Sequence, residues 1–193
     1  MIFMKVIAIN GSTRKNGNTA ILIKMVFNKL KQEGINCELL QLGNQHIKGC
    51  IGCNKCRKNK NLQCAITDDE VNTYIPKLIE ADAIILGSPT YLANITANMK
   101  SLLERLARVA GANNSLFKYK IGASVVSAKR AGGIHAFTTL NQFFLLSNMI
   151  VVGSCYWNIG IGDKIGDVED DKEARVIMET LGKNIAWVMK KLT

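Results

Sequence analysis

Five short runs that predict β-strands alternate with helix-like segments along this chain. The runs lie at residues 5–10, 36–41, 82–89, 119–127 and 149–154. Several are β-branched and apolar throughout, which is typical of strands buried on both faces. Regular alternation of strand and helix predicts a parallel sheet covered by helices on both sides. We therefore expect an α/β three-layer sandwich whose five-stranded parallel sheet has the order 2-1-3-4-5.

The segments between the strands carry helical periodicity. Apolar residues recur at spacings of three and four after the first strand, at Ala20, Ile23, Phe27 and Leu30, and Gly34 ends that helix. Further helices are expected from Asp68 and Asp69 to about residue 81, at 96–110, at 133–147 and at 170–192. The last is expected to turn five side chains inward: Val176, Leu181, Ile185, Val188 and Leu192. Without repeats or linkers, residues 1–193 are predicted to form a single domain.

Composition excludes several classes of protein. The chain has 193 residues, 48% of them hydrophobic, so it can bury a core without disulfides. No apolar run approaches the roughly 20 residues of a membrane helix, and the start lacks the features of a signal peptide. We therefore expect a cytoplasmic protein with no membrane partner. Its six cysteines are then expected to be reduced, metal-bound or redox-active.

The chain is basic, with a net charge of +10 from 25 Lys and Arg against 15 Asp and Glu. Such a surface attracts anions. No nucleic-acid-binding motif is present and the aromatic residues are few and scattered, so nucleic acid is not an expected partner. Two interpretations remain open: a solvated surface with a weak preference for anions, and a docking face for an acidic protein.

The turn after the first predicted strand, GSTRKNGNT at residues 11–19, is suited to a phosphate. Free backbone N–H groups at the start of the following helix attract an anion, and the helix dipole assists. Ser12, Asn18 and Thr19 add short polar side chains, and Arg14 adds donors that match phosphate. The turn has neither the GxxxxGK[ST] nor the GxGxxG pattern, so a phosphomonoester fits better than a nucleoside triphosphate or a dinucleotide. The alternative is a polar turn that only caps the helix.

The turn after the third predicted strand, GSPTYLANIT at residues 87–96, is suited to a flat ring. Pro89 stiffens the turn, and Tyr91 and Leu92 offer flat or apolar surface. Backbone N–H groups at residues 91–95 can bond to ring heteroatoms. The alternative is that Tyr91 packs against its neighbours and that Asn94 and Thr96 only cap the next helix.

The turn after the fourth predicted strand, residues 127–133, ends in two glycines. Gly132 and Gly133 allow a ligand to approach the backbone closely before a helix. Lys129 and Arg130 either attract the phosphates of a nicotinamide nucleotide or are simply solvated. His135 is expected to be an ordinary helix residue.

Four cysteines lie in a polar, basic insertion at residues 43–66, after the second predicted strand. Their spacing is C-x2-C-x2-C-x7-C, from Cys50 to Cys64. Three thiols at this close spacing are similar to those that hold an iron–sulfur cluster in bacterial ferredoxins. A redox C-x-x-C pair would leave two thiols without a role, and structural zinc usually has two separated pairs. Cluster, redox thiols and zinc all remain open on spacing alone.

Two of these loops together resemble the flavodoxin-like NAD(P)H-dependent FMN reductases. The motifs are GSTRKNGNT and GSPTYLANITANMKSLLER, and the resemblance extends over nearly the whole chain. Thr13 stands where many relatives carry proline, a change expected to alter stiffness more than ligand choice. By this resemblance the FMN phosphate is contacted by Ser12, Arg14, Asn16, Asn18 and Thr19. The flavin ring is contacted by Pro89, Thr90, Tyr91, Leu92 and Asn94, and the third loop adds Ser127, Gly132 and Gly133.

The insertion resembles that of the iron–sulfur flavoproteins, a branch of the same family. The following ITDDE is also similar. By that resemblance, the ligands of a four-iron, four-sulfur cluster are Cys50, Cys53, Cys56 and Cys64. The basic residues around them would offset the negative charge of the cluster and steer an acidic ferredoxin: Lys48, Lys55, Arg57, Lys58 and Lys60. Cys37 and Cys155 are expected to be core thiols.

The resemblance implies an oxidoreductase that moves electrons between a donor, the cluster, FMN and a small acceptor. The donor is ferredoxin or NAD(P)H, and the acceptor is a quinone, oxygen, peroxide or free flavin. Because the cofactor carries the chemistry, no side chain is expected to act as a catalytic acid or base. The alternatives are an NAD(P)H-dependent FMN or quinone reductase without a cluster and a non-enzymatic flavin-binding module. A homodimer or homotetramer is typical of the family.

Overall fold

The computed structural model describes residues 4–43 and 45–192. They form a six-stranded, all-parallel sheet in which the path β2-β1-β3-β4-β5 is joined by a sixth strand, β6, beside β4. The strands are β1 Lys5–Asn10, β2 Asn36–Gln41, β3 Ala83–Pro89, β4 Ile121–Ala128, β5 Ile150–Val151 and β6 Ile159–Ile161. The predicted α/β class and strand order are confirmed. Residue 44 of the predicted insertion and the ends of the predicted 1–193 domain lie outside the described residues.

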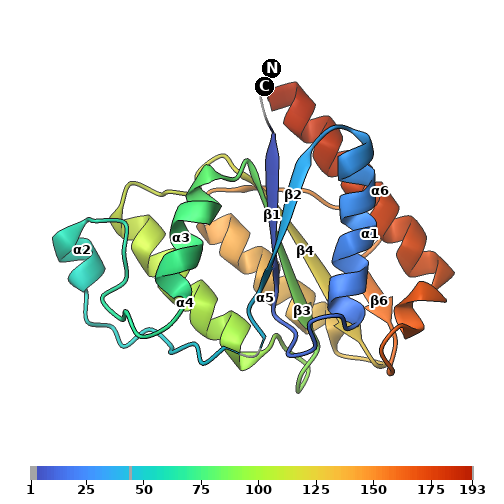
Figure 1. Cartoon of the computed structure of the whole chain (residues 1–193), viewed down its shortest axis with the longest axis horizontal. Helices are drawn as coiled ribbons and strands as arrows, with labels where there is room; N and C mark the ends of the chain where they lie inside the picture. Colours follow the sequence, from blue (N-terminus) through green and yellow to red (C-terminus); the bar gives the residue numbers. More distant parts are fainter. Residues whose placement is uncertain (1–3, 44, 193) are drawn as a thin grey trace.

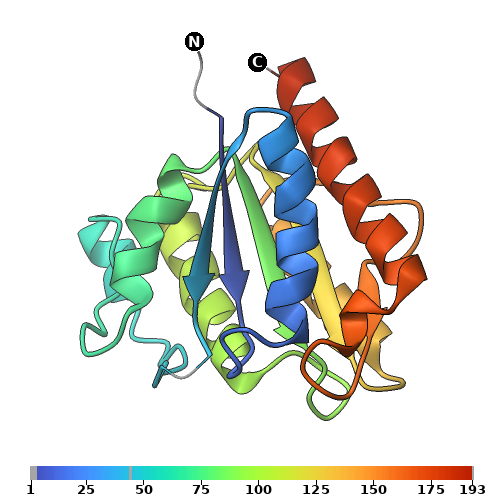
Figure 2. The ribbon, with the colours of Figure 1, turned by 45° about the vertical axis from the view of Figure 1, so that its right-hand side comes forward.

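Helices cover both faces of the sheet, as Figures 1 and 2 show. One layer contains α1 Asn18–Gln32 and α6 Lys172–Leu192, and the other contains α3 Val71–Glu80, α4 Ala97–Ala112 and α5 Gly133–Leu146. Two apolar clusters form the core, one between each layer of helices and the face of the sheet that it covers. Because β1, β3 and β4 are buried on both faces, their residues are almost continuously apolar, and this made them recognisable in the sequence.

The fifth predicted strand, residues 149–154, is wrong in extent. Only Ile150 and Val151 pair with β4 there. The chain then leaves the sheet and returns as β6, which pairs with a later part of β4. Buried Asn158 bridges the gap, because its backbone carbonyl accepts from Val126 N–H at 2.9 Å and its Nδ2 donates to the Ser124 carbonyl at 3.0 Å. A single side chain that replaces backbone hydrogen bonds between strands produces no hydrophobic periodicity, so this break in the fifth strand could not be predicted from the sequence.

The C-terminal helix was predicted correctly in position but not in its inward face. Leu181 and Ile185 are buried, whereas Val176 and Leu192 are each 58% exposed and Val188 is half-buried. The buried stripe is rotated to one side and consists of Ala174, Ile177, Met178, Leu181, Gly182, Ile185, Ala186 and Met189. Gly182 and the alanines let α6 approach α1 closely, and this contact decides which face turns inward.

The segment between β2 and α3 runs along the outside of the α4 layer. Leu42 and Ile47 are buried and fasten its start to the core, and a short helix that the sequence did not predict, α2 Lys55–Asn59, carries no buried residue. Figure 1 shows α2 at the far end of the molecule from α6. A second short helix, η1 Asp167–Glu169, precedes α6. In the part of the chain that the structure describes, no helix is both long and apolar enough to cross a bilayer.

Candidate functional site

A cavity of about 190 Å³ lies where the loops after β1, β3 and β4 meet. Parallel strands end at the same edge of a sheet, so these loops are brought together although they are far apart in the chain (Figure 2). The cavity is lined by Ser12, Arg14, Asn18, Thr19, Pro89, Thr90, Tyr91, Ser127, Ala128, Lys129, Gly162 and Asp163. Eight of the thirteen predicted cofactor-binding residues are in this lining, and five others lie outside it: Asn16, Leu92, Asn94, Gly132 and Gly133.

Hydrogen bonds join the three loops to one another. Thr19 Oγ1 lies 2.8 Å from Ser127 Oγ, and Thr90 N–H donates to the Ser127 carbonyl at 2.8 Å. Thr96 Oγ1 donates to the Gly11 carbonyl at 3.0 Å, which ties the second loop to the first. These bonds connect each of the three loops to another and so fix their relative positions.

The first loop directs donors toward the cavity. Ser12 Oγ accepts from Arg14 N–H at 3.1 Å, and this short turn places the guanidinium-bearing residue at the cavity wall. Helix α1 begins immediately afterwards at Asn18, and no side chain of the described residues caps its N-terminus. Uncapped N–H groups, the positive end of the helix dipole and an arginine together favour an anion.

Asn18 has a role that the sequence did not reveal. Its Oδ1 accepts from Gly166 N–H at 2.9 Å and its Nδ2 donates to the Lys164 carbonyl at 2.9 Å. The side chain therefore fastens the segment after β6 to the start of α1. That segment places Gly162 and Asp163 in the cavity wall, beside Ala128 and Lys129 from the end of β4.

The contribution of residues 162 and 163 was not predicted, because strand β6 was not predicted. The run IGIGDKIGD at residues 159–167 could have indicated a short strand followed by a turn, because two isoleucines precede a segment rich in glycine and aspartate. Asp163 pairs with Lys129 at 2.7 Å, and the hydrogen bond from Lys129 lowers the pKa of the Asp163 carboxyl. Lys129, for which a solvated state was one interpretation, is thus an exposed ion-pair partner at the rim of the cavity.

The second loop is a tight hairpin turn beyond the cavity wall. Tyr91 and Asn94 exchange backbone hydrogen bonds of 2.8 and 3.0 Å, and Leu92 and Ala93 take left-handed conformations with φ of 47° and 56°. Such a turn favours Gly or Asn at both central positions, so Leu and Ala there are strained. The Leu92 side chain is fully exposed at the tip. Asn94 Oδ1 accepts from Ile95 N–H at 2.8 Å, whereas Thr96 caps α4 as expected.

Thr90 supplies the clearest sign of a missing partner. Its Oγ1 is buried and makes no hydrogen bond within the described part of the chain. Buried hydroxyls are nearly always paired, because an unmade bond costs about 1–3 kcal/mol. Thr90 lines the cavity, so a polar ligand atom that comes within hydrogen-bonding distance of this hydroxyl would satisfy it.

The predicted third loop divides between two hollows. Ser127 faces the first cavity, whereas Gly132 and Gly133 line a neighbouring hollow of about 290 Å³ together with Tyr156 and Trp157. Gly132 has a φ of 84°, and a Cβ there would lie 3.1 Å from Ala93. The glycine thus lets the third loop pass close to the hairpin turn of the second.

The four cysteines of the insertion line one hollow on the outer side of α4. Its wall is formed by Cys50, Ile51, Gly52, Cys53, Asn54, Cys56, Cys64, Ala65, Ile66, Arg105, Arg108 and Val109. Cys53 is exposed and the other three thiols are partly buried. Among the described residues, no group of three or more His, Cys, Asp or Glu side chains is arranged to hold a single metal ion. A cluster presents separate iron atoms to separate thiolates, so its ligands need to surround a common hollow.

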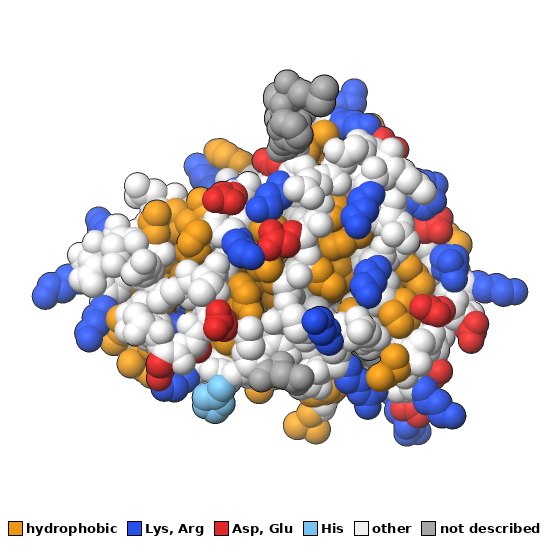
Figure 3. Space-filling model, in the orientation of Figure 1, with side chains coloured by type: hydrophobic (Ala, Val, Ile, Leu, Met, Phe, Trp, Pro, Cys, Tyr) orange, Lys and Arg blue, Asp and Glu red, His pale blue; other side chains and the backbone are white. Residues whose placement is uncertain are grey.

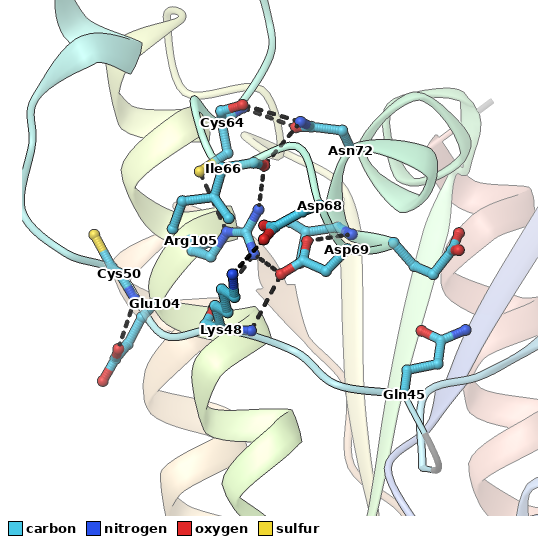
Figure 4. A network of polar contacts seen from close by, with 12 residues as sticks. Gln45, Lys48, Cys50, Cys64, Ile66, Asp68, Asp69, Asn72, Glu104 and Arg105 are labelled. Atoms are coloured by element: carbon cyan, nitrogen blue, oxygen red, sulfur yellow. Dashed lines mark hydrogen bonds and ion pairs between the residues drawn. The ribbon is translucent and has the colours of Figure 1, made fainter.

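A buried arginine supports this hollow from α4 (Figure 4). Arg105 is fully buried and pairs with Asp69, and its Nε donates to Cys64 Sγ at 3.2 Å. Burial alone would raise the pKa of the Asp69 carboxyl, but hydrogen bonds from Arg105 and from the backbone of Lys48 and Val71 outweigh it and hold that pKa low. Nothing in the sequence indicated a buried arginine here, because an Arg in an amphipathic helix is normally expected at the surface.

The remaining two cysteines are unlike each other. Burial raises the pKa of the Cys37 thiol to about 11, against a smaller opposite effect of Lys31, and the thiol donates to the Ile35 carbonyl at 3.6 Å. Cys37 is half-buried beside the apolar core, so its predicted place is close to correct. Cys155 is exposed, and its predicted place in the core is wrong because strand β5 ends at Val151.

Comparison with known proteins decides the family. The sequence model described as NADPH-dependent FMN reductase matches residues 4–164. The chain belongs to the NADPH-dependent FMN reductase family. Membership makes this FMN reductase homologue a flavin-dependent oxidoreductase and confirms the resemblance seen in the two loop motifs.

Curated relatives place the chain in one branch of the FMN reductase family. An iron–sulfur flavoprotein of Methanocaldococcus jannaschii is 39% identical over 195 residues, covering 97% of this chain and 98% of the relative. A second iron–sulfur flavoprotein of that organism is 31% identical over 191 residues, covering 93% and 94%. The chain therefore lies in the iron–sulfur flavoprotein branch.

Solved structures share the fold. A flavone reductase superposes with a TM-score of 0.72 at 16% identity, covering 98% of this chain and 64% of that one. The Trp repressor binding protein of Bacillus subtilis gives 0.66 at 16% identity, covering 91% and 96%, and an archaeal flavodoxin gives 0.61 at 19%, covering 97% and 99%. At these identities the likeness concerns the flavodoxin-like fold alone.

Proposed function

We propose that this protein binds FMN in the cavity formed by its three loops and transfers electrons between FMN and an iron–sulfur cluster held by the insertion. The observation that carries the first half is the unpaired, buried Thr90 hydroxyl in a cavity that also contains an uncapped helix N-terminus and Arg14. These groups suit a ligand with an anionic end and a polar ring, and membership of the FMN reductase family agrees. The phosphate would be held by Ser12, Arg14 and Thr19.

The residues of the loops do three things in this proposal. Donors of the first loop bind and orient the phosphate, while Pro89, Thr90 and Tyr91 form a wall against which the ring lies. Asn18 and Asp163 hold the segment 162–166 over the cavity, which limits the access of water. Five predicted contacts lie outside the cavity lining. We propose that they contact the part of FMN that extends beyond the cavity: Asn16, Leu92, Asn94, Gly132 and Gly133.

We propose that Cys50, Cys53, Cys56 and Cys64 hold a four-iron, four-sulfur cluster. The donor set consists of thiols alone, and all four line one hollow beside a buried cation. Thiolate ligands and nearby cationic donors suit a cluster that carries net negative charge. The relatives' names as iron–sulfur flavoproteins agree with this donor set. A reducing cytoplasm keeps cysteine thiols available as ligands, and we propose that the protein acts there.

When bound, FMN accepts electrons singly or in pairs and the cluster passes them singly, so the protein could connect two kinds of donor. NAD(P)H supplies two electrons as a hydride, whereas two reduced ferredoxins supply one electron each. Reduction of a quinone to its hydroquinone consumes two electrons and two protons, and oxygen, peroxide or free flavin are further candidate acceptors. No acid or base residue of this chain is assigned to these steps.

The basic insertion suits an acidic donor protein. Lys55, Arg57, Lys58 and Lys60 are all exposed, and Figure 3 shows Lys and Arg side chains at the end of the molecule where Figure 1 places α2. Complementary charge raises the rate of encounter and is screened by salt. We expect reduction by ferredoxin to slow several-fold between low and high salt, as followed by stopped-flow absorbance. A rate that does not depend on salt would contradict docking at this surface.

We also propose a homodimer or homotetramer, as is typical of the family.

Anaerobic analysis of iron, sulfide and FMN in one preparation tests the proposal. The wild-type protein is expected to contain FMN and about four iron atoms per chain and to be brown. Cys53→Ala should lose most of the iron and keep FMN, whereas Cys155→Ala, a second exposed thiol outside the set, should keep both. FMN without iron in the wild type would favour a plain NAD(P)H-dependent reductase. FMN bound without turnover of any donor would favour a flavin-binding module, and absence of FMN would overturn the whole proposal.

A further inference from the structure

We propose that Arg105 is a positioning residue for the cysteine site: it fixes Cys64 before any cluster binds and favours the more negative, reduced state of the bound cluster. This inference rests on the proposed function and extends it to a residue outside the thiol set. Arg105 is fully buried, which is rare for arginine, and its side chain bonds to Lys48, Cys64 and Ile66 of the insertion and to Asp69 just beyond it.

The guanidinium joins segments on both sides of the cysteine-bearing loop. Nη1 donates to the Lys48 carbonyl at 3.3 Å and to Asp69, while Nη2 donates to the Ile66 carbonyl at 2.8 Å. Lys48 precedes Cys50 and Ile66 follows Cys64, so one side chain of α4 holds both ends of the loop. Figure 4 shows the guanidinium between these groups. The arginine guanidinium holds its partners in a fixed plane with up to five donors, whereas a lysine has three donors at the end of a flexible stem.

Cys64 is the most firmly held of the four thiols. Besides the bond from Arg105 Nε to its sulfur, its N–H donates to Asn72 Oδ1 at 2.8 Å and its carbonyl accepts from Asn72 Nδ2 at 2.9 Å. By contrast, Cys50 is held by a 3.4 Å bond from its N–H to Glu104, and the Cys56 thiol donates to the Arg108 carbonyl at 3.8 Å. We infer that Cys64 is pre-positioned and that the first three cysteines adjust around it.

The same bond affects the charge of the bound group. One-electron reduction adds one negative charge and no proton to the cluster, and a cationic donor beside a ligand sulfur favours that state. Asp69 offsets part of the arginine's charge, but the N–H group remains directed at the sulfur. Removing this donor is therefore expected to make reduction at least tenfold less favourable, which for one electron is about 59 mV.

The test compares Arg105→Gln and Arg105→Lys with Arg175→Gln, all in the full chain. Arg175 is an exposed arginine of α6 that lies outside the lining of the cysteine hollow, so its replacement removes a positive charge away from the site. Each protein is purified anaerobically, its iron and FMN are measured, and the midpoint potential of the cluster is found by mediator titration with electron paramagnetic resonance. FMN content shows whether the variant has folded.

We expect Arg105→Gln to keep FMN, to lose iron several-fold and to shift the potential of the remaining cluster downward by at least the tenfold factor. Arg105→Lys keeps the buried charge and should fold even if Arg105→Gln does not, yet it should also show the lower potential. Arg175→Gln should match the wild type. Wild-type potential and iron in a folded Arg105→Lys or Arg105→Gln protein would overturn the inference. An iron-free wild type that still binds FMN would instead overturn the proposed cluster, and this inference with it.

Discussion

Thr19 Oγ1 and Ser127 Oγ lie 2.8 Å apart, although 108 residues separate them in the chain. Thr19 is in the first turn of α1 and Ser127 is near the end of β4, so the bond joins the first and third loops at the floor of the cavity. Both side chains are buried. Two short hydroxyls can pair here only because the sheet brings the carboxyl ends of β1 and β4 to one edge.

Removal of one of these two hydroxyls should leave the other buried and unpaired. Thr19→Val, which keeps the shape of the side chain, and Ser127→Ala are each expected to lower the free energy of unfolding by about 1–3 kcal/mol. The double variant should lose clearly less than the sum, because both partners are then absent. Denaturant unfolding of the four proteins measures the difference. Strict additivity would mean that the two hydroxyls do not interact.

Arg14 is expected to bind the phosphate of FMN and not its ring. Arg14→Ala should weaken FMN binding roughly 10–100-fold, the equivalent of about 1.5–3 kcal/mol for a hydrogen bond to a charged group. Riboflavin, which lacks the phosphate, should bind both proteins equally. Lys15→Ala removes an adjacent positive charge outside the cavity lining and should have little effect. Quenching of flavin fluorescence gives the affinities, and an equal loss for FMN and riboflavin would place Arg14 elsewhere.

Gly43 lies against the first loop. A Cβ at this position would come within 1.7 Å of the Ser12 carbonyl oxygen, so Gly43→Ala must displace backbone. We expect it to destabilise the protein by several kcal/mol, about the range of overpacked or strained sites, and to weaken FMN binding.

Gly111, in α4, provides the matched control. A Cβ there meets nothing within 4 Å, so Gly111→Ala should stabilise the protein by about 0.5–1 kcal/mol. Thermal unfolding of both variants tests the pair. A tolerated Gly43→Ala would show that the crossing of these two segments is looser than described.

The buried pair of Asp69 and Arg105 should make stability depend on pH. Because the pKa of Asp69 is lowered in the folded protein, its contribution is present above the unfolded-chain value of about 3.9 and is lost as the pH falls through the folded-state value. Asp69→Asn should cost about 3–5 kcal/mol at pH 7, since it leaves the arginine's charge buried without its partner. The difference from the wild type should shrink below pH 4 in denaturant unfolding. A difference that is constant with pH would exclude a role for the charge of Asp69.

Continuous apolar runs were enough to predict the strands that are buried on both faces, and helical periodicity was enough to predict the helices that cover them. The first, second and third strands begin and end within about one residue of their predicted bounds, because an apolar strand must be flanked by polar turns to stop. The binding loops were predicted for a similar reason. Polar or rigid residues such as Ser12, Arg14 and Pro89 at the end of a buried strand are typical of a turn or a binding site. Val176 and Leu192 were misplaced because an amphipathic pattern does not specify which of two adjacent stripes a neighbouring helix will cover.

The local sequence of this chain thus dictated its alternation of strands and helices and the presence of three polar turns at one edge of the sheet. Long-range packing alone determined that Asp163 reaches the cavity, that Asn18 binds a segment more than 140 residues away, and that Arg105 turns inward beneath Cys64. The physical reason is that burial and turn propensity act between near neighbours in the chain. The partner of a polar side chain depends instead on which distant segments the completed sheet brings beside it.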